Sequence, residues 1–267
     1  MRIAVDHRTL YRFSEPQARI VQMLRLTPTD TESQTVVSWR IGVDCDARLR
    51  DAVDGFGNHV TMLYAEGPIA ALEVSVTGEV LTANSDGVVR GAHEPLPPIF
   101  YRRATPRTAA SVALAEFAAE VAQGDPIARL HALNAALHVR FPTAPDLPDH
   151  GAGAAEAFAG AAASSRDVAQ IFVAGARSLG FPARYVSGYR MDGEAHSAPH
   201  AWAEAHVDGL GWVGFDPATG LSPTETYVRA ATGLDATGAA PIAGTRVGQG
   251  EEKLDVDLHV DRLGGEE

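Results

Sequence analysis

The sequence predicts an α+β protein, in which an N-terminal antiparallel β-sandwich is followed by helices packed on a second antiparallel sheet. Three observations predict this class: turn-separated β-rich stretches in the first ninety residues, helical spacing from Ala109 onward, and a hairpin signal after the last helix. The chain has 267 residues, which is enough for two modest cores. We expect a β-rich region over residues 1–92 and an α+β core with a closing strand over residues 93–267.

Short strands are expected throughout the first region. β-branched and aromatic residues alternate with polar ones in five stretches, which span residues 5–11, 20–26, 35–43, 60–64 and 72–81. The run Asp-Gly-Phe-Gly-Asn at residues 54–58 is a turn signal between two of them. Several short strands spaced by turns are typical of a β-sandwich.

A proline-rich stretch over residues 91–107 predicts a linker, and helical patterning follows it. Helices are expected over residues 109–123, from Pro126 to just before Pro142, and over residues 168–179. Asp125 fits the N-cap of the second helix, and Pro126 fits its first turn. Gly180 is the expected end of the third.

Strand-like stretches complete the second region. They span residues 183–189, 200–207 and 211–215, and Asp-Gly-Leu-Gly at residues 208–211 is a hairpin signal between the last two. Residues 254–260 alternate cleanly between apolar and polar, which predicts a half-exposed closing strand.

Composition excludes several classes of function. The net charge of −12 and a pI near 5.2 argue against a nucleic-acid partner. No apolar run reaches membrane length, and the first residues lack the apolar core of a signal peptide, so we expect no membrane association and a cytoplasmic location. The single cysteine, Cys45, cannot form an internal disulfide. Its neighbours Asp44 and Asp46 are expected to raise its thiol pKa, so we expect an inert residue on a strand.

Three residues form a candidate catalytic constellation. Ser165 lies where a helix starts, facing unpaired backbone N–H groups and the positive end of the helix dipole, an environment that stabilises a developing anion. His200 begins a strand, and Asp216 ends the next one. A histidine on one strand with a carboxylate on its neighbour is the base-and-orienter half of a catalytic triad.

The hairpin register sets a condition on this constellation, because facing residues must share one side of the sheet. A loop centred between Gly209 and Leu210 would pair His200 with Thr219 and turn Asp216 to the other face. A loop with an odd number of residues, or a bulge, is therefore required if His200 and Asp216 are to meet.

Three ordered segments carry a family resemblance. They read Ala-Ser-Ser-Arg-Asp-Val-Ala at residues 163–169, Pro-His-Ala-Trp-Ala-Glu at 199–204 and Gly-Trp-Val-Gly-Phe-Asp-Pro at 211–217, with Gly-Phe-Pro-Ala-Arg-Tyr-Val-Ser-Gly-Tyr at 180–189 between the first two. From about Ala154 to Gly220 the chain resembles the catalytic core of bacterial transglutaminase-like proteins, relatives of the papain-type cysteine enzymes. Their pattern opens with Gly-x-Cys-x-Asp-x-Ala, so this chain has serine at the position of the cysteine.

The resemblance implies a papain/transglutaminase-like core and a role for each residue. By position, Ser165 corresponds to the nucleophile, His200 to the general base and Asp216 to the residue that orients it. The Ser165 backbone N–H would be an oxyanion donor. Asp167 matches a family aspartate for which we expect a structural role such as a helix cap. Trp202 and Trp212 are expected to pack against the core or wall the cleft.

The serine makes the activity an open question. A hydroxyl, unlike a thiol, is not readily ionised and must be deprotonated during attack. We expect amide hydrolysis or amide acyl transfer that is weak or absent. The alternatives are a non-catalytic module that binds peptide or protein, a serine-dependent hydrolase, or an engineered replacement of the cysteine. Ala163 stands where the family usually has glycine, which favours a natural change.

A metal site is the remaining alternative, because His196, His200, Glu204 and His206 lie close together in the sequence. On a strand, however, positions 200 and 204 would be about 13 Å apart at ~3.3 Å per residue, too far to share one ion. We therefore expect no metal and no cofactor. A peptide or protein is the expected substrate or ligand. The substrate, the acyl acceptor and the oligomeric state are left open.

Overall fold

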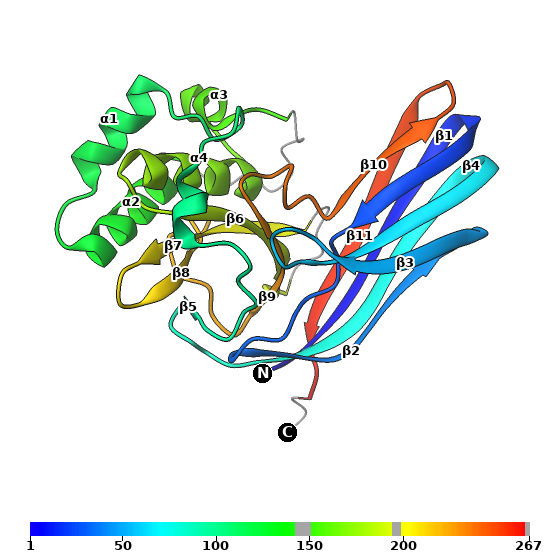
Figure 1. Ribbon diagram of the computed structural model, residues 1–267, viewed down its shortest axis with the longest axis horizontal. Coiled ribbons are helices and arrows are strands. Elements are labelled where there is room, and N and C mark those ends of the chain that lie inside the picture. Colours follow the sequence, from blue (N-terminus) through cyan, green and yellow to red (C-terminus); the bar gives the residue numbers. More distant parts are fainter. Residues whose placement is uncertain (142–150, 194–198, 265–267) are drawn as a thin grey trace.

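The computed structural model describes residues 1–141, 151–193 and 199–264. This part of the chain forms two antiparallel sheets, one of six strands and one of five, and a cluster of helices covers the smaller sheet on the side away from the larger one (Figure 1). The protein is therefore α+β, with more sheet than helix. None of the helices in these ranges is long and apolar enough to cross a membrane.

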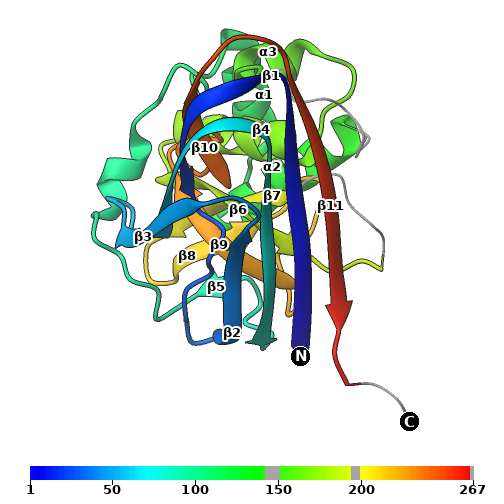
Figure 2. The same ribbon diagram turned by 90° about the vertical axis from the view of Figure 1, so that its right-hand side faces the viewer.

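The larger sheet is built around two long strands. Its members are β1 (Arg2–Leu24), β2 (Gln34–Val43), β3 (Ala47–Val53), β4 (His59–Thr82), β10 (Ile242–Val247) and β11 (Glu252–Arg262). β1 pairs with β4 along one edge, and with β11 and then β10 along the other. β4 pairs with β3 and then β2 on its outer edge. The register of β1 and β4 shifts between Arg12 and Arg19, where the long strands curl (Figure 2).

This arrangement differs from the sequence expectation in its details. The stretches 5–11 and 20–26 belong to the one strand β1, and 60–64 and 72–81 both belong to β4. The strands form one curled sheet rather than two facing sheets, so the predicted β-sandwich is not confirmed. The turn expected at residues 54–58 does join β3 to β4, and the Asp54 carboxylate accepts hydrogen bonds from the backbone N–H groups of Phe56 and Asn58.

The helices begin and end at the residues that cap them. They are α1 (Val112–Val121), α2 (Pro126–Arg140), α3 (Ala154–Ala159) and α4 (Ser165–Ser178), with a short 3₁₀ helix, η1 (Pro98–Arg102), in the expected linker. Asp125 caps α2 by accepting from Ala128 N–H, and Pro126 opens it, as predicted. Gly180, at φ +92°, follows α4 and donates to the carbonyl of Arg177. Pro142, expected to stop α2, lies outside the described residues.

The smaller sheet carries the core of the second region. Its strands, in spatial order, are β5 (Val88–Val89), β8 (Gly211–Phe215), β7 (His200–Val207), β6 (Ala183–Arg190) and β9 (Tyr227–Gly233). The odd-numbered residues of β7, with Val213 and Phe215 of β8, pack with α4 in one apolar cluster. Because side chains alternate along a strand, the even-numbered residues face the other way. That second face holds His200, Trp202 and Glu204.

The two sheets pack through a shared apolar cluster that also buries a histidine. The cluster comprises Ile3, Val5, Val80, Tyr189, Val228, Ala230, Leu258 and Val260. Next to it, His7 Nδ1 lies 3.3 Å from the hydroxyl of Tyr189, and His7 Nε2 lies 3.1 Å from the hydroxyl of Thr9. Burial lowers the pKa of His7 to about 4, an effect that the charge of Asp6 opposes.

This pKa makes the stability of the fold depend on pH. The unfolded chain, with a histidine pKa of about 6.5, binds more protons than the folded one between about pH 6.5 and pH 4, so stability is complete above that window and falls within it. We expect the free energy of unfolding to drop by about 2 kcal/mol between pH 6.5 and pH 5 through His7. Urea titrations of the native protein and of His7→Gln at both pH values measure it as the difference between the two proteins. His59→Gln, at an exposed position, serves as the control. An equal pH dependence in native protein and His7→Gln would contradict the assignment.

Candidate active site

The β7–β8 hairpin meets the register condition stated above. Val207 pairs with Gly211, which leaves a loop of three residues, 208–210, and Glu204 pairs with Gly214. Even-numbered residues therefore face even-numbered ones, and His200 and Asp216 share one side of the sheet. Gly209, at the middle of the loop, has φ +83°, a conformation that suits glycine.

His200 and Asp216 form a hydrogen-bonded pair. His200 Nε2 lies 2.8 Å from Asp216 Oδ2, and the Asp216 side chain is fully buried. Burial alone would raise the pKa of Asp216, but the charge of His200 and hydrogen bonds from His200, Tyr227 and the Ala218 N–H hold it below its usual value. Because an ionised carboxylate only accepts hydrogen bonds, Nε2 carries the proton of neutral His200. Nδ1 is then the ring nitrogen that can act as a base.

The carboxylate of Asp216 is held from three directions. Tyr227 Oη donates to the same oxygen as His200, at 2.7 Å, and the backbone N–H of Ala218 donates to the other oxygen at 3.0 Å. From α2, His138 Nδ1 contacts the carbonyl of Ala218 at 3.0 Å, and Asn134 donates to the carbonyl of Leu221. The loop after β8 is therefore anchored to a helix, which fixes the carboxylate that orients His200.

Sequence reasoning missed these supporting residues. Tyr227 lies on β9, a strand that the sequence analysis does not predict. His138 and Asn134 read as part of an amphipathic helix, with no local sign that they contact a loop about eighty residues further along the chain. A search for polar residues on the apolar face of α2 would have singled out Asn134, which is fully buried.

The N-terminus of α4 is capped by Ser164 and Asp167. Ser164 is the N-cap, its hydroxyl accepts from the Asp167 N–H, and the Asp167 carboxylate accepts from the Ser164 N–H at 3.1 Å. The expected capping role of Asp167 is thus confirmed. The helix starts three residues before the predicted Val168 because this capping box precedes its apolar pattern.

Ser165 is the first residue of α4 and is half-buried. Its backbone N–H is one of the first-turn donors that have no partner within the helix, as an oxyanion donor requires. Among the hydrogen bonds of the described residues, none joins Ser165 to His200 or Asp216. The structure thus brings His200 and Asp216 together, and the catalytic role of Ser165 stays a prediction.

A buried ionic network lies on the same face of the sheet as His200. Glu204, fully buried on β7, accepts from Arg184 Nε at 2.6 Å and from Arg229 Nε at 2.8 Å. Arg184 also donates to both oxygens of Glu94, at 2.6 and 2.8 Å, from the expected linker. Burial would raise the pKa of Glu204, but Arg229 and Arg184 outweigh it and lower this pKa to about 2. The Arg184 guanidinium carbon lies over the Trp212 ring, 3.9 Å from its centroid.

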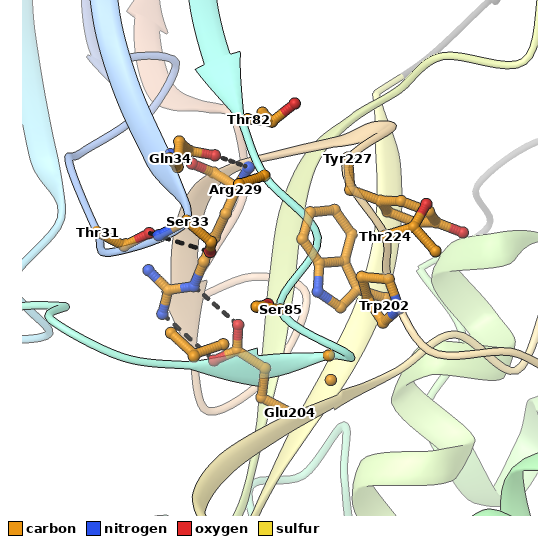
Figure 3. A pocket seen from close by; sticks show the side chains of 15 residues that line it. Thr31, Ser33, Gln34, Thr82, Ser85, Trp202, Glu204, Thr224, Tyr227 and Arg229 are labelled. Carbon is orange, nitrogen blue, oxygen red and sulfur yellow. Dashed lines mark hydrogen bonds and ion pairs between the residues drawn. The ribbon is translucent and has the colours of Figure 1, made fainter. Parts of the chain in front are cut away.

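A small polar pocket of about 60 Å³ lies beside this network (Figure 3). Trp202 and Tyr227 form one of its walls, and Glu204 and Arg229 lie across from them. The Trp202 ring is 2% exposed and packs against His200 and Tyr227, so it is a packing residue that also lines the pocket. Neither His200 nor Ser165 lines this pocket.

The sequence offered His196, His200, Glu204 and His206 as an alternative metal site. Residues 200–207 form a strand, and the carboxylate of Glu204 is occupied by two arginines, so this segment does not have the helical arrangement that shared coordination by His200 and Glu204 requires. His196 lies outside the described residues.

Cys45 lies in a bend between β2 and β3 rather than on a strand. Burial, then Asp44 and Asp46, raise its thiol pKa, as predicted.

Comparison with known proteins agrees with this architecture. Residues 3–81 match the bacterial transglutaminase-like N-terminal region, and residues 115–217 match the transglutaminase-like superfamily. The chain therefore belongs to the bacterial transglutaminase-like proteins.

Two similar proteins span nearly the whole chain. An uncharacterized protein of Mycobacterium leprae is 27% identical over 98% of this chain and 99% of its own length. The crystal structure of a provisionally assigned cysteine protease from Cytophaga hutchinsonii superposes with a TM-score of 0.79 at 20% identity, covering 100% of this chain and 92% of the other. At that identity the second likeness shows the fold alone.

Removing the charge of Glu204 tests the ionic network. In Glu204→Gln the guanidinium of Arg184, which is 1% exposed, loses a buried counter-charge, and we expect the free energy of unfolding to fall by about 3–5 kcal/mol. Glu94→Gln is the matched control, because Glu94 is 29% exposed and its loss is expected to cost about 1 kcal/mol or less. Chemical denaturation at pH 7 measures both, and equal losses would show that burial of the network does not matter.

Tyr227 is expected to help hold Asp216 in its ionised form. In Tyr227→Phe the ring remains, but Asp216 loses the hydroxyl that donates to Oδ2. Because that hydrogen bond contributes to lowering the pKa of Asp216, this pKa should rise toward its ordinary value in the variant. Carbon-detected NMR titration of the carboxylate measures this, with Asp216→Asn to identify the signal. Tyr64→Phe, at an exposed position on β4, is the control. An unchanged Asp216 pKa in Tyr227→Phe would mean that the hydroxyl does not act on the carboxylate.

Proposed function

We propose that this chain acts on amide bonds by hydrolysis or acyl transfer, with Ser165 as nucleophile, His200 as base and Asp216 as orienting carboxylate, and with low intrinsic turnover. The observation that carries the proposal is the 2.8 Å bond between His200 Nε2 and the buried Asp216. A histidine held in one tautomer by a buried carboxylate is what general-base catalysis requires. The family membership supplies the reaction class.

The proposed reaction uses groups at the start of α4 and on β7. His200 Nδ1 accepts the hydroxyl proton as Ser165 Oγ attacks the amide carbon. The oxyanion is stabilised by the Ser165 N–H and the helix dipole. The protonated imidazole then gives its proton to the leaving amine. Water completes hydrolysis, or a second amine completes acyl transfer, and the serine is regenerated.

The serine accounts for the low turnover. Cysteine, with a free pKa of about 8.5, ionises readily beside an imidazole and a helix N-terminus, whereas a hydroxyl must lose its proton during the attack itself. Binding of peptide or protein without turnover is the second candidate. It is favoured by one observation, that no hydrogen bond joins Ser165 to His200 within the described residues.

Thiol reactivity of Ser165→Cys tests the constellation without a known substrate. If His200 and the helix N-terminus act on this position, the introduced thiol should have a pKa at least about one unit below the free value of about 8.5. Iodoacetamide alkylation between pH 5 and pH 9, in a Cys45→Ser background, measures it. We expect alkylation at pH 6.5 to slow by about tenfold when His200→Ala is added.

The same helix offers a matched control. Ser178 is exposed at the other end of α4, where the dipole disfavours a thiolate, so Ser178→Cys should react as an ordinary thiol. If Ser165→Cys reacts no faster than Ser178→Cys at pH 6.5, the constellation is not assembled. Binding of peptide or protein without turnover is then the better supported function.

Amidase and transamidase assays then distinguish low turnover that is due to the serine itself from low turnover that is due to the rest of the site. We expect Ser165→Cys to exceed the native protein at least about tenfold in turnover, and that gain to vanish with His200→Ala. A native protein that is as active as Ser165→Cys, and that loses activity on His200→Ala, would be an efficient serine hydrolase, contrary to the low turnover proposed.

A further inference from the structure

One edge of the larger sheet ends in a strand whose outer side is unpaired. β11 pairs with β1 over its whole length, from Glu252 to Arg262, and no other described strand pairs with it. It lies at the rim of the sheet (Figure 2). An exposed edge of this length presents a row of backbone donors and acceptors that another strand can pair with.

The side chains of β11 alternate between two faces. Even-numbered residues of its second half, Leu258 and Val260, are buried against the smaller sheet, whereas Leu254 is 51% exposed. The odd-numbered residues carry charge or histidine and are turned outward: Lys253, Asp255, Asp257, His259 and Asp261.

This sequence is complementary to itself when read in the opposite direction. For two antiparallel copies related by a two-fold axis at Asp257, the facing pairs are Glu252 with Arg262, Lys253 with Asp261, Leu254 with Val260, Asp255 with His259 and Val256 with Leu258. Acidic side chains therefore meet basic ones or histidine, and apolar side chains meet apolar ones. Facing pairs of these kinds stabilise antiparallel strands, and like charges oppose them.

We propose that β11 pairs with β11 of a second copy of this chain, antiparallel and about a two-fold axis at Asp257. The two larger sheets then form one continuous sheet across the dimer. Each complementary pair occurs twice, as symmetry requires. The proposal does not depend on the proposed catalytic function.

The charge pattern selects this register over its neighbours. A symmetric antiparallel pair has its axis at a residue, so the alternatives move the axis by one residue. Moving it toward Glu252 places Asp255 opposite Asp257. Moving it the other way places Asp255 opposite Asp261. Each alternative creates two like-charged pairs and loses the attraction between Lys253 and Asp261.

The one like-charged contact in the proposed register is compensated within each copy. Asp257 faces its symmetry mate at the axis, but Arg8, whose Nε is also 3.3 Å from Asp6, lies directly opposite Asp257 in the register with β1. His259 Nε2 is also 3.1 Å from an Asp257 carboxylate oxygen. Across the dimer at the axis, β1 and β11 of one copy and β11 and β1 of the other therefore contribute Arg8, Asp257, Asp257 and Arg8, and these charges sum to zero. Leu254, half-exposed in one copy, packs beside Val260 of the other.

Charge exchange tests the pairing in the full chain. We expect sedimentation velocity to show a concentration-dependent monomer–dimer equilibrium that weakens as salt rises. Lys253→Asp or Asp261→Lys alone should weaken the dimer about tenfold, because two attractive pairs become repulsive. The double variant Lys253→Asp/Asp261→Lys restores opposite charges at both pairs and should return the dissociation constant to within about threefold of native. Circular dichroism confirms that each variant is folded.

Disulfide trapping tests the register itself. In a Cys45→Ser background, Asp257→Cys places two sulfurs at the axis, where facing Cα atoms are about 4.5–5.5 Å apart, within reach of a disulfide. His259→Cys is the matched control, because its facing residue is Asp255 and its own symmetry mate lies about 13 Å away.

Each outcome of these experiments is decisive. Rapid oxidation of Asp257→Cys to a dimer, without that of His259→Cys, supports the proposal, as does rescue by the double charge exchange. A native protein that stays monomeric at all concentrations would overturn it and mean that the charges of β11 protect the edge from pairing. A dimer that is unaffected by the single charge variants would overturn it as well, because its interface would lie elsewhere.

Discussion

Glu204 accepts hydrogen bonds from two arginines in a place that solvent does not reach, and this one carboxylate joins the parts of the second region. Arg184 comes from β6, Arg229 from β9 and Glu94 from the segment after β5. A buried charge without its partners is strongly destabilising, so an arrangement of these segments that separated the four charges would be disfavoured. His200 lies on the same face of β7, four residues before Glu204, and its position follows from that arrangement.

The pair of His200 and Asp216 is likewise held by contacts from several elements, in a part of the fold that is less enclosed. Asp216 is fixed by Tyr227 from β9 and by its own loop, and that loop is fixed by His138 from α2. Each contact comes from a different element, so the imidazole is oriented by the packing of the whole domain rather than by one neighbour. The N-terminus of α4 is organised independently, by the capping box of Ser164 and Asp167. The candidate site therefore has two parts, and no hydrogen bond among the described residues joins Ser165 to Asp216.

The features that could be predicted from the sequence were those set by residues close together in the chain. Asp125 and Pro126 mark the start of α2 because caps and first turns act within a few residues. Parity required an odd-numbered hairpin loop or a bulge if His200 and Asp216 were to meet, and the structure has a loop of three residues. The pairing of strands was beyond reach, because one alternating pattern fits many partners. Residues 5–11 and 20–26 gave no sign of being one strand, and β9, with Tyr227, was not recognised. The closing strand was expected, but not its partner β1. The apolar pattern of α4 begins only at Val168, but the prediction that Ser165 lies at a helix start is confirmed.

The pairing of β1 with β10 and β11 has a consequence for how the chain folds. Arg12 and Asp255, which form an ion pair between β1 and β11, are separated by 243 positions. During synthesis β1 and β4 emerge early, yet one edge of β1 stays open until the ribosome has made β10 and β11. Loop closure over such a span is slow, since contacts distant in sequence form late. The first sheet to be translated is therefore the last to be completed, and its nascent edge is exposed to other chains for most of the time that this protein takes to make.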